Sequence, residues 1–405
     1  MTDTYYRRGF GLKSAIEGQL SADYHSTVVE VLRARDFALK VADYEFHLAR
    51  EFGFCYGVDR AVDYAYETRH KFPDKRLFVV GEIIHNPHVN DKLRAMGIVF
   101  LGTGADGEFD FTPVTADDVV IIPAFGVTMR DFQRLRTIGC VLVDTTCGSV
   151  LNVWKRVERY ARDGYTAIIH GKYYHEETKA TASQAMTHEG GKYLVVFDMA
   201  EARLVCDFIE GIGTATADDL QRVFAKQRSP GFDFTRDLQR VGVANQTTML
   251  SSESLAIAAE LGKSMTRRWG AEATAEHFRS FDTICSATQE RQDAVEQLLV
   301  DGVDLMIVVG GYNSSNTCNL AALVHSRGVR VLHIEDADGI EPETQRVRYR
   351  DVVTKQEATQ EQWLGSARRI GVTAGASTPN NKIGETIVRI CATAGIGAEL
   401  DAALA

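Results

Sequence analysis

Short apolar segments alternate with helical patterns along most of this chain, from about residue 44 onward. The segments are continuously apolar, which is typical of strands buried on both faces of a parallel sheet. Parallel strands need crossover connections, and the intervening helical patterns supply them. The sequence therefore predicts an α/β fold. The expected strands are Leu77–Val80, Val119–Pro123, Val141–Val143, Thr166–Ile169, Tyr193–Phe197, Leu305–Val309, Val329–Ile334 and Arg369–Thr373. The expected helices are 58–70, 88–96, 129–137, 150–163, 252–268, 288–300, 316–327 and 381–394.

Three cysteines occupy equivalent places in this alternation. Cys55 lies in GFCYG, Cys147 in DTTCG and Cys285 in DTICSAT, and a helical pattern follows each of them at once. A helix N-terminus lowers the pKa of a thiol, because the macrodipole favours the thiolate, which is the form that binds a metal. The spacing matches neither paired zinc ligands nor a ferredoxin cysteine run. A shared metal centre with an open fourth position is one interpretation, and three separate thiols is the other.

The other four cysteines follow no such turn. A lone cysteine is usually a small buried side chain, and we expect this of Cys140, Cys206, Cys318 and Cys391.

The cysteine positions suggest a division of the chain into three α/β units. We expect an N-terminal extension at 1–43 with a helix near 26–40, a first unit at 44–146, a second at 147–284 and a third at 285–405. The second unit carries a polar, charged segment at about 198–240, which resembles an insertion. Without it the cysteine spacings become similar, which favours a pseudo-threefold arrangement with the cysteine loops at the centre.

Composition excludes several classes of protein. The 405 residues carry a net charge of −10, which argues against non-specific nucleic-acid binding. No apolar run approaches the roughly 20 residues that a membrane span needs. The cysteine count of 7 is odd and no secretory h-region is recognisable, so we expect a cytoplasmic protein without a disulfide framework.

Polar loops follow four of the expected strands. They are Gly81–Asn86, His170–Thr178, Gly310–Thr317 and Thr373–Pro379, and Asn245–Thr248 is a further small polar cluster. Hydroxyl, amide and backbone N–H donors at the start of a helix can bind a phosphate group. Ordinary helix capping would need fewer such residues than Gly310–Thr317 has, whereas His170–Thr178 could equally be a polar surface loop and His85 could be structural.

These motifs together resemble one family. GFCYGVDRAV, GEIIHN, DTTC, HGKYYHEET, NQTT, DTICSATQERQ, GGYNSSNT and TAGAST occur in the order typical of the 4-hydroxy-3-methylbut-2-enyl diphosphate reductases. The resemblance covers about 45–390 and is stronger to the plant and cyanobacterial branch. It implies a three-lobed α/β trefoil around a central iron–sulfur cluster. It also implies reductive dehydroxylation of (E)-4-hydroxy-3-methylbut-2-enyl diphosphate to isopentenyl and dimethylallyl diphosphates, the last step of the non-mevalonate isoprenoid pathway.

The resemblance also implies roles for individual residues. Cys55, Cys147 and Cys285 would hold one [4Fe–4S] cluster per chain, whose open iron binds the substrate alcohol. Glu177 would supply a proton, and Thr247 would order Glu177 and the substrate hydroxyl. The substrate-binding positions would be His85, His175, Thr288, Ser314, Ser315, Asn316 and Ser377. His88 and His170 match no functional position.

One position departs from the bacterial pattern. Phe125 stands where many bacterial members have a histidine, and it cannot bond to a diphosphate. The plant-like branch shares this change.

Two other functions remain open at this level. One is a different three-cysteine [4Fe–4S] trefoil enzyme, similar to quinolinate synthase, and the other is an iron–sulfur sensor without catalysis. The family implies ferredoxin or flavodoxin as electron donor and a small allylic diphosphate as substrate, with no nucleic-acid or membrane partner. The product ratio, the oligomeric state and the roles of 1–43 and 198–240 stay open.

Overall fold

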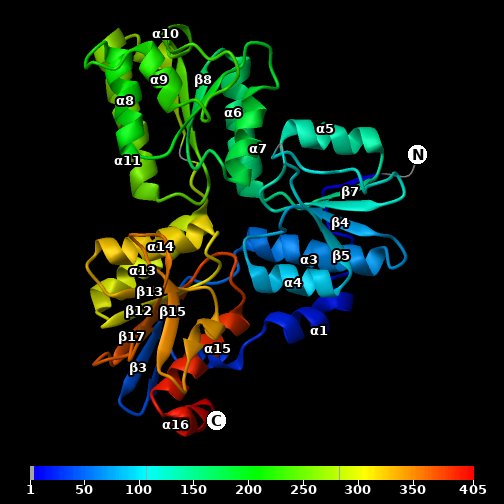
Figure 1. Ribbon diagram of the computed structural model, residues 1–405, viewed down its shortest axis with the longest axis vertical. Helices are drawn as coiled ribbons and strands as arrows, with labels where there is room; N and C mark the ends of the chain where they lie inside the picture. Colours follow the sequence, from blue (N-terminus) through cyan, green and yellow to red (C-terminus); the bar gives the residue numbers. More distant parts are fainter. Residues whose placement is uncertain (1–3, 106, 282) are drawn as a thin grey trace. The chain divides into compact units, whose positions relative to one another are not determined.

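The computed structural model describes residues 4–105, 107–281 and 283–405 (Figure 1). Asp282 of the DTIC motif lies outside these residues. The chain forms two compact units. The first comprises Met1–Arg8, Lys75–Gly81 and Val99–Cys285, and the second comprises Gly9–Asp74, Glu82–Ile98 and Ser286–Ala405.

The first unit contains two sheets. The five-stranded sheet has the order β1-β7-β6-β4-β5, with helix α5 (Met129–Ile138) following β6. Its strands are β1 (Tyr5–Tyr6), β4 (Leu77–Val80), β5 (Ile98–Leu101), β6 (Val119–Ile122) and β7 (Val141–Asp144). The four-stranded sheet has the order β11-β10-β8-β9 and is parallel throughout. Its strands are β8 (Thr166–His170), β9 (Tyr193–Val196), β10 (Val241–Asn245) and β11 (Phe278–Ser280).

Helices cover both faces of the four-stranded sheet, because successive side chains of each strand point to opposite faces. Ile168 packs with α8 (Met199–Glu210) and α11 (Ser251–Trp269), which lie side by side in Figure 1. Ala167 and Ile169 pack on the other face with α6 (Gly148–Arg162) and α7 (Glu176–Ala185). The short helix α12 (Thr274–His277) precedes β11.

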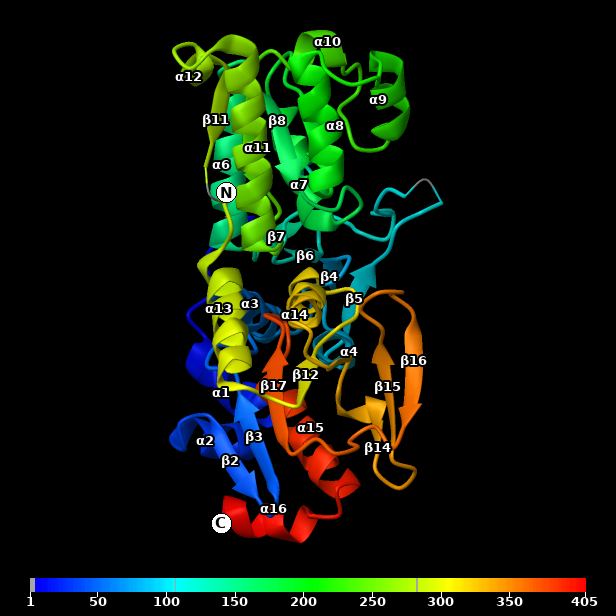
Figure 2. The same cartoon turned by 90° about the vertical axis from the view of Figure 1, so that its left-hand side faces the viewer.

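The second unit is built on an eight-stranded sheet of order β14-β15-β13-β12-β17-β3-β2, with β16 added to β15 (Figure 2). Its centre, β13-β12-β17-β3, is parallel. The strands are β2 (Ala38–Val41), β3 (Tyr44–Leu48), β12 (Leu305–Val309), β13 (Val331–Ile334), β14 (Ile340–Glu341), β15 (Arg346–Arg350), β16 (Glu357–Glu361) and β17 (Arg369–Ala374).

Two helical layers enclose this sheet. Helices α13 (Ser286–Asp301) and α14 (Ser315–Ser326) pack on one face through Val295, Leu320 and their neighbours. Helices α2 (Thr27–Ala34), α15 (Asn380–Thr393) and α16 (Gly397–Leu404) contribute to the core on the other face. Helices α1 (Lys13–Tyr24), α3 (Tyr56–Lys71), α4 (Pro87–Ala95) and the 3₁₀ helix η1 (Ala337–Gly339) complete the unit.

The predicted α/β class is confirmed. All eight expected strands and all eight expected helices are present, with small shifts of their ends. The expected helix near 26–40 is shorter, because Asp36 and Phe37 have positive φ angles of 55° and 63° that end it, and β2 follows. No helix in the part of the chain that the structure describes has the length and apolar character of a membrane span.

Strand pairing crosses the expected unit boundaries. β1, from the N-terminal extension, pairs with β7, whereas β2 and β3 join the sheet of β17. Phe46 and Leu48 of β3 are buried in the core of that sheet. The division into domains stays a prediction, with bounds at 1–43, 44–146, 147–284 and 285–405.

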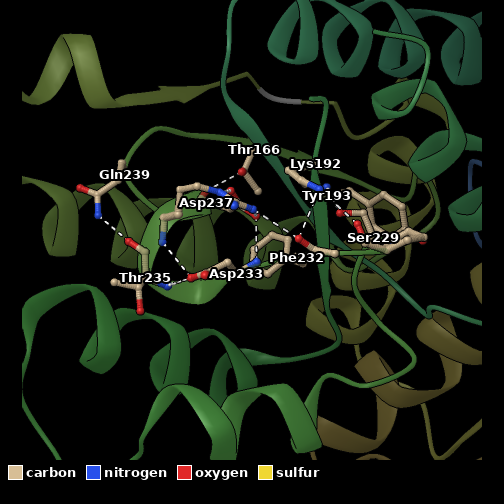
Figure 3. Close-up of polar contacts among 12 residues, drawn as sticks. Thr166, Lys192, Tyr193, Ser229, Phe232, Asp233, Thr235, Asp237 and Gln239 are labelled. Atoms are coloured by element: carbon tan, nitrogen blue, oxygen red, sulfur yellow. Dashed lines mark hydrogen bonds and ion pairs between the residues drawn. The ribbon is translucent and has the colours of Figure 1, made fainter. Parts of the chain in front are cut away.

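The segment expected as an insertion at 198–240 has two parts. Helix α8 is a full layer of the four-stranded sheet, with Ala202 and Val205 buried in its core. The rest contains α9 (Ala217–Val223) and α10 (Phe234–Asp237), and its stretch from Ser229 to Asp237 is bonded to the amino ends of the strands (Figure 3). There Lys192 Nζ donates to the carbonyl of Pro230 at 3.1 Å, and the Tyr193 N–H donates to Ser229 Oγ at 3.2 Å. The Thr166 hydroxyl likewise donates to the carbonyl of Asp237. This part therefore covers the edge opposite the carboxyl ends of the strands.

Two buried histidines predict a pH dependence of stability. Burial lowers the pKa of His170 and of His333 to about 4. The unfolded chain binds protons more readily below about pH 6.5, so stability is full above that pH and falls as the pH drops toward 4. Each histidine contributes at most about 1.4 kcal/mol per pH unit in this window.

Denaturant unfolding of the apo-protein at several pH values measures this dependence. His333→Gln, which can still donate to the carbonyl of Gly310, should have a shallower decline than the unsubstituted chain between pH 6.5 and 4. His25→Gln changes an exposed histidine and should leave the decline unchanged. Equal slopes in His333→Gln and the unsubstituted chain would contradict the assignment.

Candidate active site

The three cysteines lie at helix N-termini, as the sequence predicts. Cys55 is the N-cap residue of α3 and Cys147 that of α6, both with extended backbone and neither making a side-chain capping bond. Cys285 directly precedes Ser286, where α13 begins. All three are half-buried and none is in a disulfide. Cys147 and Cys285 belong to the first unit and Cys55 to the second, and their sharing of one metal centre stays a prediction.

Backbone hydrogen bonds fix two of these turns. The Cys147 N–H donates to the carbonyl of Ala124 at 2.8 Å, and the Cys55 N–H donates to that of Ala376 at 3.2 Å. Each bond runs to the loop at the end of a strand in the same unit. The positions of the thiols are therefore set by the sheets rather than by the helices alone.

The remaining cysteines differ from these three. Cys140, Cys206 and Cys391 are buried in apolar cores, and burial raises the pKa of their thiols to about 11, 12 and 12. This confirms that they are core side chains. Cys318 is only half-buried, with its Sγ 3.3 Å from the carbonyl oxygen of Tyr312.

Glu177 is a buried carboxyl group at the start of α7. The side chain is 2% exposed, and Oε1 accepts a hydrogen bond of 2.6 Å from the backbone N–H of Thr247. The two residues meet because β8 and β10 are parallel neighbours, with His170 opposite Asn245. The structure thus places Thr247 against Glu177, through its backbone N–H.

His175 caps the same helix. Its Nδ1 accepts from the Glu177 N–H at 3.1 Å, and the imidazole is 6% exposed. Phe125 packs edge-on against the imidazole ring, with centroids 6.1 Å apart. At the position of the bacterial histidine, this chain has an aromatic ring that contacts His175.

Gln246 is a site residue that sequence reasoning missed. It is fully buried, and its Oε1 accepts from the Lys172 N–H and from the Thr178 hydroxyl, both at 3.1 Å. Its Nε2 donates to the Thr248 hydroxyl at 2.8 Å. Gln246 therefore joins the loops after β8 and β10. Its place in the polar NQTT cluster was the available signal.

A cradle of small polar groups lies at the carboxyl ends of β12 and β17 in the second unit. Ser314 caps α14, and its Oγ is 3.5 Å from the Ser377 Oγ. The Oδ1 of Asn316 accepts from the Ala376 N–H at 2.9 Å. Its Nδ2 is buried and has no hydrogen-bond partner among the described residues. An unpaired buried donor costs about 1–3 kcal/mol, which favours an incoming acceptor here.

Two other predicted residues, Ser315 and Thr288, are also buried in this unit, at the start of α14 and in α13.

His85 is adjacent to this cradle. Its backbone carbonyl accepts from the Ser377 hydroxyl at 3.1 Å. Its Nδ1 is 2.9 Å from the Glu82 Oε2, which also accepts from Asn313 Nδ2 at 3.0 Å. A Cβ on Gly311 would lie 2.8 Å from the His85 carbonyl oxygen, so this approach requires glycine. Glu82, which orients the imidazole, carried no signal beyond its place in GEIIHN.

The predicted site residues thus form two groups. Glu177, His175 and Thr247 are together in the first unit, and His85, Ser314, Asn316 and Ser377 are together in the second. The first group offers a buried carboxyl, and the second offers neutral hydrogen-bond donors for an anion.

Comparisons with known proteins agree with the sequence motifs. The family model described as LytB protein matches residues 46–391. The 4-hydroxy-3-methylbut-2-enyl diphosphate reductase of Gloeobacter violaceus is 46% identical over 97% of this chain and 93% of its own length. That of Acaryochloris marina is 42% identical over 98% of this chain and 96% of its own length.

Solved structures share the fold. The E-1-hydroxy-2-methyl-but-2-enyl-4-diphosphate reductase of Plasmodium falciparum aligns with a TM-score of 0.63 at 21% identity, covering 85% of this chain and 87% of that one. A structure of (E)-4-hydroxy-3-methyl-but-2-enyl diphosphate reductase aligns with a TM-score of 0.50 at 27% identity, covering 85% of this chain and 98% of that one. The predicted fold class and family resemblance are confirmed. The chain belongs to the LytB protein family.

Proposed function

We propose that this chain reductively dehydroxylates (E)-4-hydroxy-3-methylbut-2-enyl diphosphate to isopentenyl and dimethylallyl diphosphates, the last step of the non-mevalonate isoprenoid pathway. The observation that carries the proposal is the near full-length similarity to reductases of this name. The buried carboxyl and the cradle of neutral donors supply groups that this chemistry needs.

The residues present fit an iron–sulfur cofactor, which the family implies. Such clusters are held by cysteine thiolates, and three half-buried cysteines at helix N-termini, none of them in a disulfide, are an appropriate donor set. We assign one [4Fe–4S] cluster per chain to Cys55, Cys147 and Cys285, with the three α/β units arranged around it. When bound, the cluster supplies electrons and a Lewis-acidic iron for cleavage of the C–O bond.

The cradle of the second unit would bind the diphosphate. Ser314 and Ser377 offer hydroxyls and Asn316 offers its unpaired Nδ2, with Ser315 beside them. His85 is oriented by Glu82, and His175 would add a second imidazole. Holding the diphosphate fixes the hydroxymethyl carbon for reaction, which is the positional part of the catalysis. Thr288 is assigned to the same substrate site.

Glu177 would supply the proton that lets the hydroxyl leave as water. Loss of the hydroxyl consumes two electrons and two protons, one of which forms water while the other goes to carbon. The Thr247 N–H fixes the carboxyl group of Glu177, so the proton is delivered from one position. We assign Thr247 to ordering both Glu177 and the substrate hydroxyl.

The electron donor we propose is a ferredoxin or a flavodoxin. The location we propose is the cytoplasm, since all seven cysteines are free, as expected in a reducing compartment. The substrate is a small allylic diphosphate.

Anaerobic purification, a visible spectrum and turnover with a chemically reduced low-potential dye test this function. A brown protein that converts the hydroxylated diphosphate to the two five-carbon diphosphates would support it. Tight binding of this diphosphate without turnover by any such donor would favour an iron–sulfur sensor. Turnover of a dicarboxylate instead would favour a quinolinate synthase-like enzyme.

Replacing Glu177 tests the proton donor. Glu177→Gln keeps the shape of the side chain but removes the acidic proton, so kcat should fall by about 10²–10⁴-fold with iron content unchanged. Glu189→Gln changes an exposed carboxyl group beyond the end of α7 and should keep most of the activity. An active Glu177→Gln enzyme would refute this role.

Replacing Cys147 tests the ligand set. Cys147→Ser removes one of three thiolates, so the anaerobically purified protein should be colourless, depleted of iron and inactive. Cys318→Ser alters a half-buried cysteine outside the set and should keep its iron. Normal iron content in Cys147→Ser would show that this residue is not a ligand.

Replacing Asn316 tests the diphosphate cradle. Asn316→Asp exchanges the unpaired Nδ2 donor for a charged oxygen that repels a diphosphate. KM should rise by about ten- to a hundredfold, the equivalent of a lost buried hydrogen bond. Asn319→Asp, later on α14, should change KM little, and equal effects of the two substitutions would contradict the assignment.

A further inference from the structure

Arg291 connects two loops next to proposed cluster ligands. It lies on α13 and is 3% exposed. Its Nη2 donates to the carbonyl of Gly53 at 2.7 Å, two residues before Cys55. Its Nη1 donates to the carbonyl of Ala287 at 2.8 Å, in the first turn of the helix that follows Cys285.

The loop that Arg291 holds is tightly packed. Gly53 has a φ of +68°, and a Cβ there would lie 3.1 Å from both the Thr378 carbonyl oxygen and the Asn380 Oδ1. The Gly53 carbonyl therefore has a fixed direction, and the guanidinium of Arg291 sits against it. A contact of this kind sets the backbone immediately before Cys55.

Arg291 is also a buried cation, with no carboxylate in hydrogen-bond contact in the part of the chain that the structure describes. Among the described residues its hydrogen bonds run only to the two carbonyls, and its Nε is buried with none. Asp59 of α3 is coupled to it electrostatically but is not in salt-bridge contact. A buried charge is costly unless an anion compensates it. The described residues therefore offer Arg291 a carboxylate only at a distance, and a closer anion would stabilise its charge further.

An iron–sulfur cluster with thiolate ligands is such an anion. We infer that Arg291 is a positioning residue for the cofactor: it holds the Gly53–Cys55 loop, and its buried charge offsets the negative charge of the cluster. This inference rests on the proposed function for the presence of the cluster. Reduction adds negative charge, so a nearby buried cation should raise the reduction potential, one of the levers by which proteins tune such clusters.

The test is the midpoint potential of the anaerobically purified holoprotein, measured by dye-mediated titration. Arg291→Gln removes the charge but retains an N–H donor, and should shift the potential downward. Arg291→Lys retains the charge and should stay close to the unsubstituted protein. Arg389→Gln is the matched control, because Arg389 also donates to a carbonyl, that of Ile340, but pairs with Asp338. An unchanged potential in Arg291→Gln would overturn the inference.

If Arg291→Gln loses its cluster, its midpoint potential cannot be measured, and Arg291→Lys then tests the role of the charge. A lysine variant that keeps its iron and its potential supports the role of the charge. A lysine variant that loses iron equally, or has an equally lowered potential, overturns it. An unsubstituted protein that never holds a cluster would instead refute the proposed function.

Discussion

Parallel strands that lie side by side end at the same edge of their sheet. After each strand the chain continues through a loop into a helix, whose N-terminus lies at that edge. In the first unit this brings the loop after β8 against the loop after β10, so that Glu177 accepts from the Thr247 N–H. In the second unit the same relation between β12 and β17 brings Ser314 and Asn316 against Ser377 and Ala376. Residues far apart in the chain therefore meet within one unit.

The opposite edge serves a different purpose. The amino ends of β8 and β9 are covered by the segment around Ser229 to Asp237, whose backbone carbonyls and Ser229 hydroxyl accept hydrogen bonds from these ends. Phe232 and Phe234 anchor this segment in the apolar core. The carboxyl edge of the same sheet carries the buried Glu177 carboxyl, which accepts from the Thr247 N–H. The packing contacts of this segment and the candidate site residues therefore lie at opposite ends of the sheet.

Much of this could be predicted from the sequence because its strongest signals are local. Continuous apolar runs such as Leu305–Val309 identify buried strands, and a cysteine directly before a helical pattern identifies an N-cap position. β3 was harder, since Glu45 and His47 interrupt its apolar residues and its partner β17 lies far along the chain. Gln246, Glu82 and Arg291 were missed because a polar side chain shows its partners only in three dimensions.

We propose that three cysteines from distant parts of the chain hold one cluster and leave one iron without a thiolate. Mössbauer spectroscopy of protein reconstituted with ⁵⁷Fe measures this directly. We expect about a quarter of the iron absorption to differ from the rest and to shift when the hydroxylated diphosphate is added, because one iron in a [4Fe–4S] cluster would lack a cysteine ligand. Four equivalent irons that do not respond to this diphosphate would contradict the account.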